Sequence, residues 1–244
     1  MINLKILIIR HGDPDYVNDS LTEKGFKEAE LLSEKLKNMD IKSIYCSPLG
    51  RARATMEPTL QKLGKKAEIY DWLREFSAFV IDNKTGNKRV PWDLMPSYWT
   101  KDEKFYHRTN WLDTDIMKTG NVAEKYNEVC KGLDELLARH GYVHDGNIFR
   151  VEKENNDTIA FFCHFGVECV LISHILGISP PALWQGFVAL PSSVTTLITE
   201  EREQGIAYFR CNGFGDLSHL YTGKEPPSFS ARFCETYSNM EERH

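Results

Sequence analysis

The stretch Leu4-Lys5-Ile6-Leu7-Ile8-Ile9-Arg10-His11-Gly12 decides the fold class of this chain. Its apolar part, residues 4–9, has the length of a buried strand and is far too short for a signal peptide or a membrane span. Such a strand delivers Arg10, His11 and Gly12 to its carboxyl end, which is the edge where open α/β sheets place their ligands. We therefore expect a strand that carries a histidine and a cation to a pocket.

Helical and strand patterns alternate along the rest of the chain. A helix start at 19–25 precedes apolar residues at helical spacing, and a second helix runs from Ser47-Pro48 to about Gly64. The alternation predicts a three-layer α/β/α sandwich with a mostly parallel central sheet. Beyond the first strand, further strands are expected at 41–46, 67–70, 148–152, 158–163, 194–199 and 207–211, with later helices at 122–137 and 167–176.

Residues 77–119 interrupt this alternation, because they mix proline, glycine and many aromatic residues without clear periodicity. We interpret them as an insertion within a single domain of residues 1–244. Two hypotheses stay open. The segment either caps a pocket, with Trp92, Tyr98 and Trp99 contacting the substrate, or forms a small satellite core under a surface loop.

Composition excludes several classes of function. The formal net charge of −5 and the lack of a basic run argue against nucleic-acid binding, whose affinity comes mainly from Lys and Arg. The six cysteines form no CxxC pair and no metal-ligand spacing with histidine, so reduced thiols and no metal are expected. We expect a cytoplasmic enzyme without a membrane partner and without a cofactor.

Two further elements place charged side chains at the ends of strands. Arg51 lies in Ser47-Pro48-Leu49-Gly50-Arg51, where its guanidinium would face the same sheet edge as His11. His164 follows the expected strand 158–163 and precedes Phe165-Gly166, which can start a helix. Two histidines and two arginines at one sheet edge are suited to hold a phosphoryl group.

This set of motifs resembles the histidine phosphatase superfamily, which has the phosphoglycerate-mutase-like fold. The similarity covers residues 6–75 and resumes from 158 to about 177. It implies that His11 attacks phosphorus and forms a phosphohistidine, which water then hydrolyses without a metal. The equatorial oxygens would be held by Arg10, Arg51 and His164.

The resemblance also implies an acid that protonates the leaving group, and this sequence departs from the family pattern around it. The acid lies shortly after the third strand, so Glu75 is the candidate, although residues 76–79 lack the usual small-residue signature. Phe165 stands where a second glycine often follows the histidine, which would narrow the pocket. The loop 13–18 lacks the usual acid-threonine pair, and its asparagine, Asn18, lies one residue late as a candidate phosphate contact.

The sequence therefore predicts a phosphatase that hydrolyses phosphomonoesters, with a small phosphorylated metabolite as its partner. One alternative is a phosphoglycerate mutase, which would carry a longer loop after Arg10-His11-Gly12. The other is a catalytically degenerate domain that binds phosphorylated ligands, which would have lost one of the four site residues. The sequence names neither the substrate nor the oligomeric state.

Overall fold

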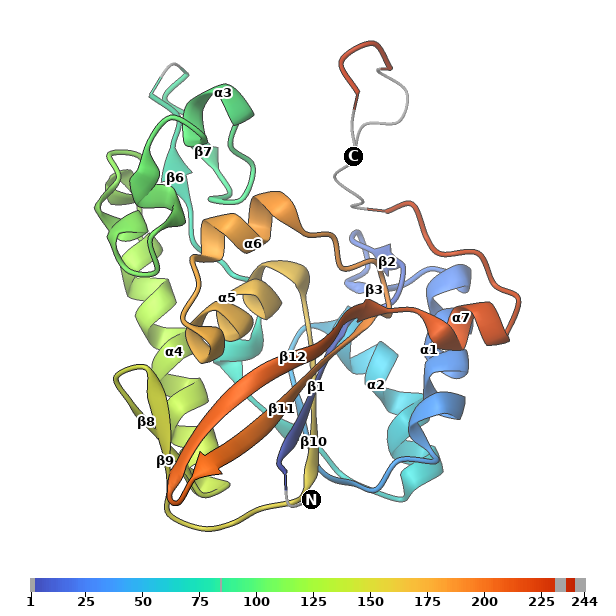
Figure 1. Cartoon of the computed structure of the whole chain (residues 1–244). Coiled ribbons are helices and arrows are strands. Elements are labelled where there is room, and N and C mark those ends of the chain that lie inside the picture. The colour runs from blue at the N-terminus through green and yellow to red at the C-terminus, as the bar shows by residue number, and fades with distance from the viewer. Residues whose placement is uncertain (1–2, 84, 231–235, 240–244) are drawn as a thin grey trace.

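The computed structural model describes residues 3–83, 85–230 and 236–239 (Figure 1). Within these ranges one sheet of eight strands has the order β5-β4-β10-β1-β11-β12-β9-β8. The strand of the opening motif, β1, therefore lies inside the sheet. The strands are β1 Lys5–Arg10, β4 Ile41–Cys46, β5 Glu68–Ile69, β8 Tyr142–Asp145, β9 Ile148–Val151, β10 Thr158–Cys163, β11 Val194–Glu203 and β12 Ile206–Asp216.

The predicted α/β class is confirmed, but the sheet is mixed and not mostly parallel as predicted. The pairings β5·β4, β4·β10 and β10·β1 are parallel, whereas β11, β12, β9 and β8 each join antiparallel to the preceding strand of the sheet. Two of these antiparallel pairings, β8·β9 and β11·β12, are tight hairpins, because a short turn can join only antiparallel strands. Gly146 turns β8 into β9 and Gly205 turns β11 into β12, both with positive φ. The sequence prediction missed β8.

Helices cover both faces of the sheet (Figure 1). On one face lie α1 Glu23–Leu36, α2 Gly50–Leu63 and the short α7 Ser218–Thr222. On the other lie α4 Val122–Arg139, α5 Phe165–Leu176 and α6 Pro180–Gly186, of which α6 was not predicted. The three-layer arrangement expected from the sequence is confirmed.

Local chemistry sets the ends of these helices. Thr22 caps α1 by accepting a hydrogen bond from the Gly25 amide at 3.1 Å. Gly64 ends α2 and Gly177 ends α5, each in the left-handed conformation that glycine adopts without steric cost. Helix α2 begins at Gly50, two residues after the Ser47-Pro48 start predicted from the sequence, with Leu49 as its N-cap.

The sheet separates two apolar cores, and β1 contributes to both. Leu7 and Ile9 pack in the cluster that includes α1 and α2 residues, whereas Ile6 and Ile8 pack in the cluster that includes α4 and α5 residues. Successive side chains of a strand point to opposite faces, so a strand buried on both faces is apolar at every position. This explains the unbroken run Ile6 to Ile9.

Residues 77–119 contain short elements only. They are β6 Val80–Ile81, β7 Lys88–Arg89, α3 Pro96–Trp99 and 3-10 turns at Glu103–Tyr106, Asn110–Asp113 and Met117–Thr119. Phe105 and Trp111 are almost fully buried and belong to the same cluster as the α4 and α5 side chains. The buried part of the segment therefore extends the main core rather than forming a separate one.

Two small elements complete the description of the fold. A hairpin joins β2 Pro14–Asp15 to β3 Ser20–Leu21, and a 3-10 turn spans Asp71–Leu73. Within the described residues, no helix combines the length and the apolar character needed to cross a membrane.

Replacing Trp111 by alanine should lower the free energy of unfolding by about 3–5 kcal/mol, because the indole is fully buried and its removal leaves a cavity. Denaturant unfolding followed by fluorescence measures this. Trp99→Ala is the matched control, because Trp99 is only partly buried and should cost much less. Equal losses in the two variants would contradict the assignment of Trp111 to the main core.

Candidate active site

The pairing of β1 with β10 brings two histidines together. The strands are parallel and in register, with Arg10 opposite Cys163, so the next residue of each strand leaves the sheet at the same edge. These residues are His11 and His164, and their ring centroids lie 5.1 Å apart. The prediction that both histidines meet at one sheet edge is confirmed by this geometry.

The hydrogen bond of His11 identifies its free nitrogen. Nδ1 lies 2.7 Å from the carbonyl oxygen of Gly12, and a carbonyl only accepts hydrogen bonds, so Nδ1 carries the proton. In the neutral ring, Nε2 then bears the lone pair. Burial lowers the pKa of His11 well below its ordinary value, and the neighbouring charges of Arg10 and Arg51 lower it further. His11 is thus a neutral imidazole, the form that acts as a nucleophile.

His164 is held from the neighbouring strand. Its Nε2 lies 2.8 Å from the hydroxyl oxygen of Ser47, the residue after β4, and its ring is fully buried. Its Nδ1 has no hydrogen-bond partner within the described residues. Burial lowers the pKa of His164 well below the usual value, with His11 and Arg51 as further causes. The ring is therefore neutral and can donate or accept one further hydrogen bond.

Arg10 is a buried cation beneath the histidines. It donates a hydrogen bond to the carbonyl of Ala189, and its guanidinium carbon lies 5.6 Å from the centroid of the Phe165 ring. Burial lowers its pKa, while the carboxylates of Glu75 and Glu168 act in the opposite direction. Phe165, whose bulk was expected to narrow the pocket, is itself buried and packs against this cation.

Arg51 lies in the first turn of α2, as predicted, and is paired with an acid. Its Nη1 lies 2.6 Å from Oδ1 of Asp19, whose other oxygen accepts the Gly50 amide at 2.7 Å. Asn18 is exposed, and its side-chain amide donates to Asp15 at 2.7 Å. The structure therefore places Asp19, and not Asn18, against Arg51; a contact of Asn18 with substrate stays a prediction.

Glu75 approaches the start of α5. Its Oε1 accepts the backbone amide of Phe76 at 2.8 Å. A Cβ on Gly166 would lie 2.6 Å from this Oε1 and 2.9 Å from the Trp92 ring, so only glycine lets the carboxyl come so close. Burial raises the pKa of Glu75, while the Phe76 amide and Arg10 oppose the shift. A raised pKa lets this carboxyl carry a proton nearer neutral pH.

Of the three aromatic residues predicted to contact substrate, Trp92, Tyr98 and Trp99, the first lies beside Glu75. Trp92 shares the space above Gly166 with Glu75, and its ring lies 6.0 Å from that of Trp184. The ring contacts of Tyr98 and Trp99 are with Phe105 and Tyr106, inside the insertion itself. The structure thus brings one of the three predicted aromatic residues beside the acid, and the roles of all three in binding stay predictions.

Sequence reasoning missed the residues that orient the site. Ser47 was interpreted only as part of a helix start, and Asp19 only as part of another. Thr55 was counted only as a helix residue, yet its hydroxyl accepts the Gly12 amide at 2.9 Å and donates to the Arg51 carbonyl at 2.8 Å. What they share is that each is a small polar residue near a motif residue in the sequence. Only the fold shows which of these residues contact the site.

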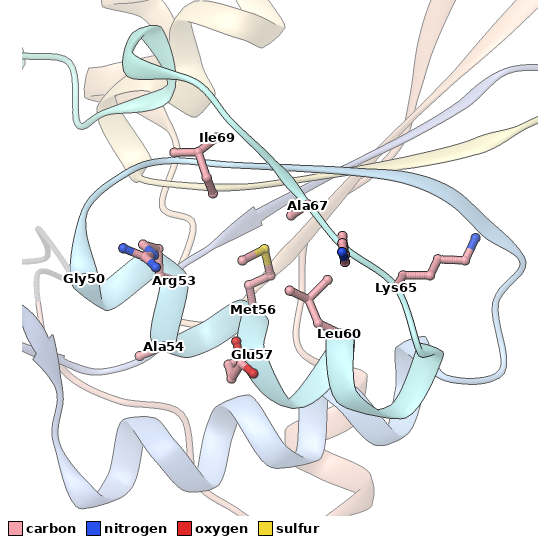
Figure 2. Close-up of a pocket in the computed structure, with 10 residues that line it drawn as sticks. Gly50, Arg53, Ala54, Met56, Glu57, Leu60, Lys65, Ala67 and Ile69 are labelled. Carbon is pink, nitrogen blue, oxygen red and sulfur yellow. The ribbon is translucent and has the colours of Figure 1, made fainter.

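A separate cavity of about 590 Å³ lies against α2. Figure 2 shows Met56 and Leu60 of the helix facing the extended segment that carries Ala67, with Arg53 and Lys65 at the margin. Neither histidine lines this cavity. The candidate active site lies instead at the ends of β1 and β10, where His11 and His164 come together.

The site combines the buried cation Arg10, the partly buried cation Arg51, two neutral imidazoles and one carboxyl with a raised pKa. The cations and imidazoles can hold the oxygens of a dianionic phosphoryl group, and Nε2 of His11 can attack its phosphorus. The carboxyl can give a proton to a leaving oxygen. This chemistry is the kind that acid-assisted phosphoryl transfer requires.

Known proteins share this chain's sequence pattern and fold. A model of the histidine phosphatase superfamily (branch 1) matches residues 6–212. The chain is 26% identical over 232 residues to a Schizosaccharomyces pombe protein that carries the name "probable phosphatase", covering 89% of this chain and 95% of that protein. It is 39% identical over 61 residues to a 2,3-bisphosphoglycerate-dependent phosphoglycerate mutase of Thermoplasma acidophilum, covering 21% of this chain and 30% of the mutase.

The fold is also similar to solved structures. A phosphoserine phosphatase mutant from Entamoeba histolytica, in complex with phosphoserine, superposes with a TM-score of 0.58 at 18% identity. The superposition covers 89% of this chain and 99% of that chain. At this level of identity the likeness concerns the fold.

Both site imidazoles should remain neutral when the pH falls to about 6, because their pKa values lie well below the 6.5 of a free histidine. NMR of the histidine-labelled chain measures this, with the His11→Asn and His164→Asn variants identifying each signal. The urea-unfolded chain is the control, since its histidines should titrate near about 6.5. Titration of His11 at or above that value in the folded chain would contradict the assignment.

Proposed function

Because the chain belongs to the histidine phosphatase superfamily and is a phosphatase, we propose that it hydrolyses phosphomonoesters through a covalent intermediate on His11. The observation that carries this proposal is the tautomer of His11. Its Nδ1–H is committed to the Gly12 carbonyl at 2.7 Å, which leaves the Nε2 lone pair for phosphorus. The charges of the buried Arg10 and the partly buried Arg51 act on this nucleophile.

In the first step, Nε2 of His11 bonds to phosphorus as the phosphorus–oxygen bond of the ester breaks. The leaving oxygen takes the proton of Glu75, whose raised pKa supports this role. In the second step, water gives its proton to the Glu75 carboxylate and its oxygen to phosphorus, which releases phosphate and restores His11. Arg10, Arg51 and His164 hold the phosphoryl oxygens in both steps.

Without substrate, Arg51 is paired with the carboxylate of Asp19. We propose that the substrate's phosphoryl oxygens compete with Asp19 for this guanidinium, whose Nη1 lies 2.6 Å from Oδ1 of Asp19. Asp19 has a positive φ, and its carboxylate is about half exposed, so the loop can release it. The acid thereby keeps the cation in place between turnovers.

The substrate class that fits this proposal is a small phosphorylated metabolite. We propose a single domain in which residues 77–119 cap the pocket, supported by the position of Trp92 beside Glu75 and Gly166. A cytoplasmic location also remains our proposal; the cysteines that the structure describes are free thiols, as expected in a reducing compartment.

The mutase alternative rests on a match over 61 residues, which covers 30% of the mutase. The relative matched over 95% of its length carries a phosphatase name, so we favour hydrolysis. A mutase would interconvert phosphoglycerates faster than it releases phosphate, and a degenerate domain would bind phosphorylated ligands and release none.

Replacing His11 by alanine should abolish phosphate release from a panel of phosphorylated metabolites that includes phosphoserine, because the nucleophile is removed. Release is measured with chelator present, and circular dichroism checks that the fold is intact. His140→Ala is the control, because His140 hydrogen-bonds Tyr45 at 2.7 Å and lies outside the site. Retained release in the folded His11→Ala variant would contradict the covalent mechanism.

Replacing Glu75 by glutamine should slow the hydrolysis of alkyl phosphates by about 10²-fold or more, but that of p-nitrophenyl phosphate far less, because nitrophenolate leaves without a proton. The measurement is kcat/KM for both ester classes.

Gly166→Ala tests the same acid from its other side, because the new Cβ would lie 2.6 Å from Oε1 of Glu75. It should also reduce activity most for poor leaving groups. Gly186→Ala is the matched control, since its Cβ would meet nothing within 4 Å. Equal losses on both ester classes in Glu75→Gln would show that another residue supplies the proton.

A further inference from the structure

A second cluster of titratable side chains lies away from the active site. It consists of Asp134 on α4, His144 on β8 and His174 in the last turn of α5. Oδ1 of Asp134 lies 3.2 Å from Nδ1 of His144 and 2.8 Å from Nε2 of His174. One nitrogen of each ring and one carboxylate oxygen all lie within 4.8 Å of one another.

The two rings are fixed by their packing. His144 stacks on Phe149 with ring centroids 4.7 Å apart and an interplanar angle of 13°. His174 meets His144 edge to face, with centroids 4.5 Å apart and an angle of 87°. Both imidazole side chains are mostly buried, with about 15% of their surface exposed. The donor atoms are therefore held toward a common point by stacking and by helix geometry.

We propose that Asp134, His144 and His174 form a binding site for a divalent transition metal ion of the zinc class. Two imidazole nitrogens and one carboxylate oxygen are ligands that zinc favours. Donors about 2.0–2.1 Å from a tetrahedral zinc ion are separated by about 3.3 Å. The two separations from Asp134, 2.8 and 3.2 Å, are close to this value, and the two ring nitrogens lie within 4.8 Å of each other. On binding, each ring would offer the ion the lone pair of the nitrogen that now faces Asp134 and would carry its proton on the other ring nitrogen.

The surroundings provide access for the ion and room for a fourth ligand. A cavity of about 330 Å³ is lined by His144 and His174 and also by Arg108 and Tyr208. A water molecule in this cavity can complete the coordination. Oδ1 of Asp134 already faces both rings, so the carboxylate is placed to bind the ion together with them.

The proposed metal site is separate from the catalytic site, and a bound ion would affect the stability of the fold. His164 precedes α5 and His174 lies ten residues further along it, about 15 Å away at the helical rise. A bound ion would replace the two contacts of Asp134 with His144 and His174 by metal bonds, and so would join α4, α5 and the β8–β9 hairpin more firmly. Bound zinc should therefore stabilise the chain and leave the phosphoryl chemistry to His11.

Titration calorimetry with zinc chloride on the metal-stripped full-length chain tests the proposal, and visible absorption with cobalt(II) reports the ligand geometry. One zinc ion per chain should bind, with a raised thermal midpoint. Asp134→Asn and His174→Gln should weaken binding at least 10-fold and abolish the rise in midpoint. Two variants should bind zinc like the natural chain: His107→Gln, an exposed histidine of the insertion, and His11→Ala, which excludes binding at the active site.

Circular dichroism establishes that each variant is folded, and His144→Gln replaces any variant that is not. Absence of zinc binding by the natural chain would overturn the proposal. Unchanged affinity in Asp134→Asn and His174→Gln would overturn it as well, and would leave Asp134 as a carboxylate that only bridges two histidines by hydrogen bonds.

Discussion

The parallel pairing of β1 with β10 is the constraint on which the rest of the site depends. Ile6 lies opposite Ile159 and Arg10 opposite Cys163, so the two strands end together and release their histidines at one point. Side chains alternate between faces, and a shift by one residue would exchange the two faces of β1. It would move Ile6 and Ile8 out of the α4–α5 core at the same time as it misplaced His11. The same register of β1 therefore both packs the core and positions His11.

The electrostatics of the site depend on burial more than on any single pair. Removal from water disfavours charge, so both site histidines are neutral and Glu75 has a raised pKa. Glu168, fully buried behind Arg10, also has a pKa raised to about 7, and it accepts the Thr195 hydroxyl at 2.6 Å. Arg10 therefore faces carboxyls that only partly offset its charge. The positive charge that remains favours the binding of a dianionic ligand over water.

Patterns that are local in the sequence predicted most strands and helices, and they also predicted the two histidines and two arginines that the fold brings together at the candidate site. Ile6 to Ile9 indicates a buried strand because every side chain is apolar, and sheet geometry then fixes where the next residues of the chain lie. Relations that depend on tertiary structure were not predictable. Asp19 reaches Arg51 across a loop, and the antiparallel half of the sheet depends on two-residue turns. Asp134, His144 and His174 share no motif spacing and meet only when three elements pack together.

The place of β1 in the sheet has a consequence for how the chain is made. β1 is synthesised before its neighbours in the sheet, β10 and β11, which end more than 150 residues later at Cys163 and Glu203. On the ribosome its apolar run must wait without partners while most of the chain is still being translated, and such contacts between distant segments form slowly. An unpaired apolar strand is the kind of segment that aggregates. Yield from a cell should therefore depend on translation speed and on chaperones that shield β1.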